Sequence, residues 1–214
     1  MPRSIGRRSL FGTMAAIACA FAFGRPSTAE AAAAAPIHRL CDSLVNVMKA
    51  GSASASFQQR YAMLEPIVDA VFNLPAILQV SVGPTWSSLP PDQQQALLGA
   101  FRRYTVASYL NSFDTYSGQH FDVQPDTKSL PGGEQLVQTR IVSQSGTSHE
   151  LDYVMRDGGG AWHVVDVLAD GSISRVAVQR SDFRRLLAHG GGPALFDSLQ
   201  QKTADLSGGA LRGG

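Results

Sequence analysis

The chain has 214 residues, of which 44% are hydrophobic and 16% are charged, and its formal net charge is +1. This length is sufficient for one domain with a core of its own. A nearly neutral chain offers no basic stripe to a phosphate backbone, which argues against a nucleic-acid-binding function.

Residues 1–31 have the features of a secretory signal peptide. A basic start precedes an apolar run over residues 10–23, which is short for a transmembrane helix, and residues 27–31 contain an Ala-x-Ala cleavage site. The pair Arg7-Arg8 also resembles a twin-arginine export signal. We therefore predict export to the periplasm and removal of residues 1–31, with an uncleaved anchor as the alternative.

Cleavage after residue 31 removes four arginines and one glutamate from the 18 basic and 17 acidic residues. The remaining 183 residues carry 14 basic and 16 acidic side chains, a net charge of −2. Cys19 leaves with the signal, so Cys41 has no partner for an internal disulfide. Because its neighbours at helical spacing are apolar, Cys41 is predicted to be a buried free thiol.

The first half of the exported chain is predicted to be helical. Residues 31–35 are expected to be a linker, and apolar residues then recur at helical spacing. Pro66 and Pro75 predict a bent or segmented second helix, because proline lacks an amide donor. The predicted helices span 37–48, from near 56 to 82 with the bend across 61–82, and from 90–91 to between 112 and 117, with a turn at 83–84 before the third.

The second half changes to an alternating pattern with glycine-rich connections, which predicts an antiparallel meander. A helix is expected to start at Ser181 and to stop at residues 190–192, before a last helix over 193–206 and a disordered tail over 207–214. The predicted strands are 119–124, 135–143, 149–156, 162–168 and 172–179. This order predicts an α+β domain over residues 32–206, with helices packed over a curved antiparallel β-sheet.

Polar residues within the predicted strands have two interpretations. Asp166 interrupts an apolar strand, and we expect it to accept hydrogen bonds from turn amides rather than to orient a bound molecule or a partner. Arg140 and Arg156 lie on neighbouring strands and could meet a phosphate, although a solvated sheet face is the preferred interpretation.

No motif for bond-making chemistry is present in the sequence. His163 and Asp166 lie three residues apart on a strand and should face opposite sides, while Tyr109 and Asp114 form a second pair to consider as a general base site. The five histidines lack the spacing of metal ligands, so neither a metal nor a cofactor is predicted. We predict that the protein is not an enzyme. A small cone-fold enzyme and a periplasmic adaptor that binds only protein partners are kept as alternative functions.

Five short motifs appear in a characteristic order. They are Gly83-Pro84-Thr85-Trp86 before Gln93, Phe101 to Tyr104, Tyr116-Ser117-Gly118-Gln119, Trp162 with Asp166, Gly171 and Ser174, and Ser181-Asp182-Phe183. In this order, behind a signal peptide, they resemble the MlaC-like family, also called the toluene-tolerance family, of periplasmic lipid-transport proteins. The resemblance covers roughly residues 57–206, and the sequence departs from it at residues 73–75 and in its glycine-rich ending.

The resemblance implies a carrier that holds a phospholipid's acyl chains in an apolar pocket between sheet and helices. It also implies exchange with an inner-membrane transporter complex and an outer-membrane lipoprotein complex. The hopanoid-associated HpnM branch implies a hopanoid as the alternative cargo. Balanced charge and the absence of heptads favour a monomer. The expected lipid-binding residues are apolar or aromatic and face inward: Val68, Val71, Phe72, Ile77, Leu78, Phe101, Tyr104, Leu151, Tyr153, Met155, Trp162, Val164 and Leu168.

Overall fold

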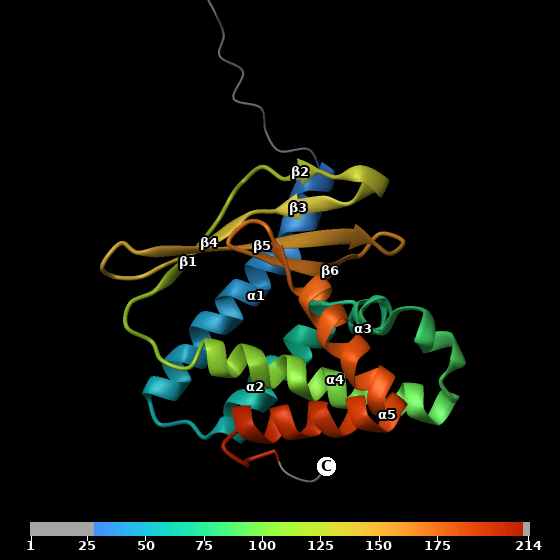
Figure 1. Cartoon of the computed structure of the whole chain (residues 1–214). Helices are drawn as coiled ribbons and strands as arrows, with labels where there is room; N and C mark the ends of the chain where they lie inside the picture. The colour runs from blue at the N-terminus through green and yellow to red at the C-terminus, as the bar shows by residue number, and fades with distance from the viewer. Residues whose placement is uncertain (1–27, 212–214) are drawn as a thin grey trace, which may run out of the picture.

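The computed structural model describes residues 28–211, in which helices lie beneath a curled antiparallel sheet (Figure 1). The predicted signal peptide therefore lies almost entirely outside the described residues. The helices are α1 (Thr28–Ser52), α2 (Phe57–Val71), α3 (Leu74–Val82), α4 (Pro91–Ser112) and α5 (Arg175–Leu206), with the short 3₁₀ helices η1 (Gly83–Ser88) and η2 (Pro131–Gly133). The strands are β1 (His120–Val123), β2 (Lys128–Ser129), β3 (Gln135–Val137), β4 (Thr139–Val142), β5 (Ser148–Asp157), β6 (Trp162–Ala169) and β7 (Ile173–Ser174).

Helix α1 is longer than its apolar pattern indicated. The prediction of a linker at residues 31–35 is wrong, because the helix already includes them and buries Ala33 and Ala34 in the core. Alanine has the highest helix propensity, and its small side chain lets a helix pack closely. No helix within residues 28–211 is long and apolar enough to cross a membrane.

The predicted segmented helix is confirmed, with its break between α2 and α3. The Ser56 hydroxyl accepts a hydrogen bond from the Gln59 amide (3.2 Å), which caps the start of α2. At the break, the Asn73 amide donates to the carbonyl of Val164 on β6 (2.9 Å), and its side chain accepts from Ala76 (3.1 Å). The new helix start is thereby attached to the sheet.

The predicted antiparallel meander is confirmed around β5 as the central strand. Strand β6 pairs along one edge, while β3 and β4 pair in succession along the other; β1 extends from β4 and β2 from β3. At the junction of β3 and β4, the buried Asp152 accepts from the Thr139 amide (3.1 Å) and from the Gln138 side chain (3.4 Å). The carboxylate thus satisfies polar groups that the broken ladder leaves unpaired.

The prediction of a strand over residues 172–179 is wrong, because α5 begins at Arg175. The alternating valines of this segment have the spacing that predicts a strand, whereas the hydrogen bonds at its start stabilise a helix. The Ser174 hydroxyl accepts from the Ala177 amide (3.0 Å), and Asp166 on β6 accepts from the Val176 amide (3.1 Å). A side chain from another strand therefore completes the helix cap.

The predicted stop at residues 190–192 is a kink within α5. Gly191 has φ 63° and ψ −155°, a conformation that residues with a Cβ avoid. A Cβ on Gly192 would lie 2.5 Å from Oε1 of Gln93, so α5 approaches α4 closely here, and a larger residue would require the Gln93 side chain to move. Of the tail that we expected to be disordered, residues 207–211 form turns in which Ser207 is buried, and residues 212–214 lie outside the described residues.

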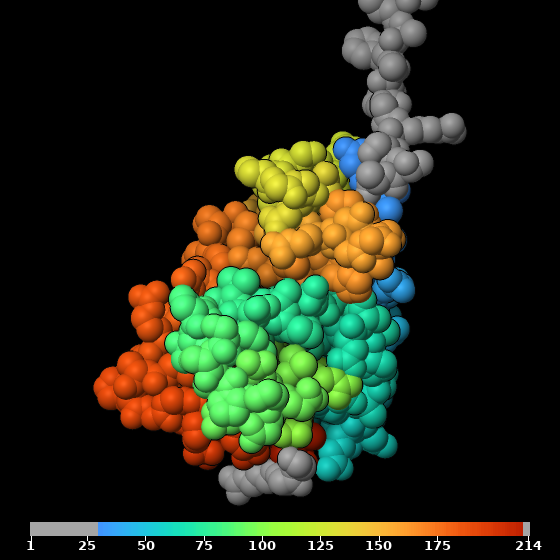
Figure 2. Space-filling model, turned by 90° about the vertical axis from the view of Figure 1, so that its right-hand side faces the viewer, coloured from blue at the N-terminus to red at the C-terminus, as the bar shows by residue number. Residues whose placement is uncertain are grey.

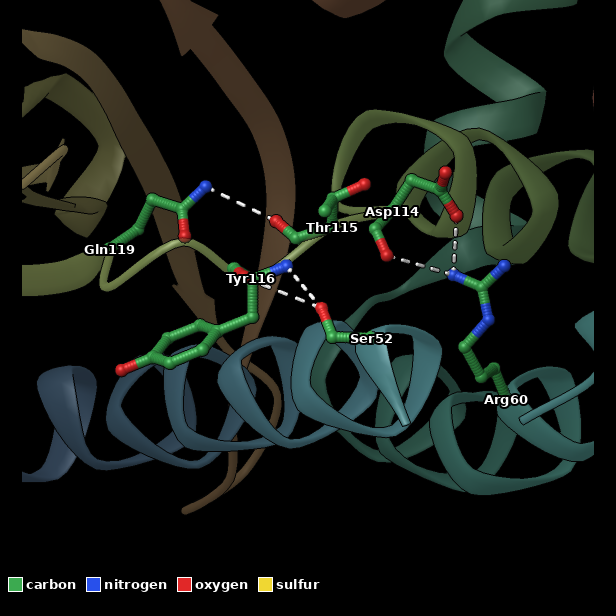
Figure 3. Close-up of polar contacts among 6 residues, drawn as sticks. All are labelled: Ser52, Arg60, Asp114, Thr115, Tyr116 and Gln119. Carbon is green, nitrogen blue, oxygen red and sulfur yellow. Dashed lines mark hydrogen bonds and ion pairs between the residues drawn. The ribbon is translucent and has the colours of Figure 1, made fainter. Parts of the chain in front are cut away.

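The segment that follows α4, which includes the Tyr-x-Gly-Gln motif, is bonded to the end of α1 and to α2 (Figure 3). The Ser52 hydroxyl accepts from the Tyr116 amide (3.0 Å) and donates to the Tyr116 carbonyl (3.4 Å). Arg60 pairs with the Asp114 carboxylate (2.7 Å), and the Gln119 side chain donates to the carbonyl of Thr115 (3.2 Å). These contacts are structural, and they hold the segment that follows α4 in place.

Candidate functional site

A cavity of about 220 Å³ lies between the sheet and the helices. It is partly open to solvent, and most of its lining is aliphatic or aromatic. The lining comes from the end of α2, from α3 and α4, from β5 and β6, and from the start of α5: Phe72, Leu74, Ile77, Phe101, Tyr104, Thr105, Ser108, Tyr109, Ser112, Phe113, Leu151, Asp166, Val167, Ala169, Arg175, Val176 and Gln179.

The structure divides the predicted pocket residues into two groups. Five line the cavity, and the other eight lie outside its lining. The five are Phe72, Ile77, Phe101, Tyr104 and Leu151. Of the eight, Val68, Val71, Leu78, Tyr153, Met155 and Val164 are buried in the core, whereas Trp162 and Leu168 are partly exposed on β6.

A bulge in β6 explains why Leu168 does not line the cavity. Strict alternation would place Val164 and Leu168 on the same face of the strand. The register shifts between Val154 and Met155 of β5, so that one extra residue of β6 separates the two halves of the strand. The extra residue reverses the alternation, and Val167 lines the cavity in place of Leu168.

Helix α4 supplies a wall of the cavity that carries several hydroxyl groups. Residues 104, 105, 108, 109 and 112 share one helical face, and this spacing was a signal that the sequence contained. The Thr105 hydroxyl donates to the carbonyl of Phe101 (2.8 Å). The Ser108 hydroxyl is buried and has no hydrogen-bond partner among the described residues. Water or a bound molecule would supply that partner.

Aromatic rings continue from the cavity wall towards β1. The ring of Tyr109 lies 5.5 Å from that of Phe72, edge to face, and 6.0 Å from that of Phe113, which it stacks upon. Burial raises the pKa of Tyr109 well above its usual value, although neighbouring Tyr153 and the charge of Arg175 oppose the shift. Burial likewise raises the pKa of Tyr153. Both hydroxyls therefore stay neutral at physiological pH, so Tyr109 contributes no anionic oxygen to the wall.

One positive charge lies at the cavity. Arg175, the first residue of α5, lines it with an exposed side chain that makes no hydrogen bond or ion pair within residues 28–211. Sequence reasoning missed this residue because its segment was assigned to a strand. Arg156 instead pairs with Glu134 (2.6 Å), and Arg140 is exposed on β4, so neither lines the cavity.

The two residue pairs considered for general base catalysis are not assembled in the described chain. Both oxygens of Asp166 are occupied at the start of α5, by the Ser174 hydroxyl (2.5 Å) and by the amides of Val176 and Val167. The interpretation of Asp166 as an acceptor for turn amides is thus confirmed. His163 contacts the carbonyl of Ala161 (3.1 Å), and Asp114 is engaged by Arg60 rather than by Tyr109.

Comparison with known proteins identifies the family. The family model "MlaC protein" matches residues 38–201, which is most of the chain. The toluene tolerance protein Ttg2D of Pseudomonas putida is 27% identical over 109 residues. That match covers 51% of this chain and 49% of Ttg2D, so the chain spans about half the length of this curated relative.

A solved structure has the same fold. The phospholipid-binding protein from Ralstonia solanacearum, determined in complex with a phospholipid, superposes with a TM-score of 0.70 and 18% sequence identity. The superposition covers 82% of this chain and 98% of the other. The extent of the family match, over residues 38–201, establishes that this chain belongs to the MlaC family.

Proposed function

We propose that this protein is a periplasmic carrier that holds the acyl chains of a phospholipid in the cavity between α3, α4, α5 and the sheet. The single observation that carries the proposal is a partly open, mostly apolar cavity whose lining includes the guanidinium of Arg175, which has no ion-pair partner within residues 28–211. Family membership and the phospholipid held by the Ralstonia solanacearum protein support the same cargo class.

The physical requirement is the removal of acyl chains from water. Each methylene gains about 0.8 kcal/mol when it leaves water for an apolar site, so a lipid crosses an aqueous compartment only inside such a site. Aliphatic and aromatic side chains supply that site here, while Arg175 offers a charged hydrogen-bond donor to the phosphate. The carrier would exchange its lipid with an inner-membrane transporter complex and an outer-membrane complex, and it needs no catalytic group for that task.

The size of the cavity bears on how the lipid enters. Its volume of about 220 Å³ is below the range of roughly 300–1,000 Å³ that is usual for small-molecule sites. We therefore expect the cavity to widen when a two-chain lipid binds, by movement of α5 at its Gly191 kink relative to α4.

The test is direct. The full chain is expressed with its own N-terminus, purified from the periplasmic fraction without detergent, and extracted with organic solvent for mass spectrometry. About one phospholipid per chain is the expected result. A hopanoid in the extract would assign the alternative cargo, and a folded but lipid-free protein would refute the carrier function in favour of an adaptor.

A further inference from the structure

The first half of α5 concentrates positive charge on the surface. Arg175, Arg180, Arg184 and Arg185 lie within eleven residues, all four side chains are exposed, and none makes a hydrogen bond or ion pair within residues 28–211. The acidic side chain of this stretch, Asp182, faces Lys202 at 4.0 Å. The near-neutral composition gave no indication of such a basic stripe, because net charge does not show where charges gather; this local excess is complementary to an anionic surface.

Apolar side chains are exposed beside these arginines. Ile173, just before the helix cap, is 51% exposed, and Val178, one turn into α5, is 46% exposed. Val80 of the neighbouring α3 is 49% exposed, and α3 contacts α5 through the hydroxyl of Ser81 and the side chain of Gln179 (3.4 Å). Apolar side chains that lie beside basic ones suit a surface that docks on an anionic membrane, because the apolar groups enter the interface while the basic groups meet the headgroups.

A hollow of about 390 Å³ lies beside the same helix, between η1 and α5. Figure 2 shows this side of the molecule, with the green η1 segment facing the viewer and the orange-red first half of α5 projecting beside it. Arg180 and Arg184 both border the hollow, together with Thr85. Two guanidinium groups beside a hydroxyl supply the donors that a phosphate group prefers.

We propose that this basic ridge, consisting of Arg180, Arg184 and Arg185 with Ile173 and Val178, docks the protein on an anionic phospholipid bilayer. The hollow between η1 and α5 receives the phosphate of a bilayer lipid, while the two apolar side chains enter the interface. Arg175 links the ridge to the cavity, so docking would bring the cavity close to the bilayer. The purpose of docking rests on the proposed carrier function, whereas the binding itself does not.

The test is vesicle flotation with the purified full chain. Vesicles of phosphatidylcholine containing 30% phosphatidylglycerol are compared with pure phosphatidylcholine, at low and high salt. Each arginine near an anionic surface strengthens binding about fivefold, so the variant Arg180→Gln/Arg184→Gln/Arg185→Gln is expected to bind roughly 100-fold more weakly. High salt should abolish the preference for anionic vesicles.

A matched control removes three exposed positive charges elsewhere. Arg39→Gln/Lys128→Gln/Arg140→Gln has the same net charge as the ridge variant, and its binding should stay within twofold of wild type. Equal binding by the two variants, or a wild-type protein that does not prefer anionic vesicles, would overturn the proposal. The ridge would then be assigned to the binding of an acidic protein partner. Lipid extracted from the same preparations is measured separately, so loss of the carrier function is distinguishable from loss of docking.

Discussion

Replacement of Ser108 by leucine separates lipid binding from folding. Its hydroxyl is buried at the cavity wall without a partner among the described residues, so its removal exposes no broken hydrogen bond. Leucine and alanine have similar helix propensities, and leucine adds three carbons beyond alanine. At about 0.8 kcal/mol for each methylene that those carbons displace, Ser108→Leu should weaken lipid retention by about 2.4 kcal/mol relative to Ser108→Ala, roughly 60-fold.

The assay combines lipid content with stability. Lipid per chain is quantified after detergent-free purification, exchange of a fluorescent phospholipid ranks the affinities, and thermal unfolding is followed on delipidated protein. We expect Ser108→Leu to lose its lipid while it melts no lower than wild type, because the leucine fills part of the cavity of about 220 Å³. The reasoning is refuted if Ser108→Leu keeps wild-type lipid content, or if Ser108→Ala loses lipid equally, since the hydroxyl itself would then be the binding group.

Three further predictions concern the scaffold. Gly51→Ala should destabilise the fold by about 1–3 kcal/mol, because the new Cβ would lie 2.6 Å from the carbonyl oxygen of Asp114. Gly99→Ala has open space around it and should stabilise α4 by about 0.5–1 kcal/mol. Urea denaturation measures the free energy of unfolding of both variants, and equal effects would contradict the clash at Gly51. Asp166→Ala should lower the free energy of unfolding by about 1–3 kcal/mol in the same measurement, because it removes the cap of α5, and Asp166→Asn should lower it less. An alanine variant as stable as wild type would exclude that capping role. Burial raises the pKa of the Cys41 thiol from 9.0 to about 12, so its contribution to stability is present below pH 9 and is lost as the pH rises towards 12, because only the unfolded thiol ionises there. Native protein should resist thiol reagents at pH 8 and react in urea, and rapid native labelling would show that Cys41 is accessible.

The sequence alone was sufficient for the layers and for the main helices and strands up to β6, whereas the start of α5 was wrongly predicted to be a strand. Helical spacing before Ser112, alternation after Gly118 and glycine-rich turns are local patterns, because each depends on interactions between residues close in the chain. The motif from Tyr116 to Gln119 was visible for the same reason, although its hydrogen bonds to Ser52 and Thr115 became evident only in the structure.

The tertiary structure decided which apolar side chains line the cavity. Val167 and Leu168 are adjacent apolar residues of β6, yet Val167 lines the cavity and Leu168 is partly exposed, because an extra residue earlier in the strand changes the pairing with β5. Likewise, Arg175 reaches the cavity because Asp166, nine residues earlier on another element, caps the start of α5. Burial and capping between elements depend on contacts between residues that are distant in the sequence, so local periodicity does not predict them.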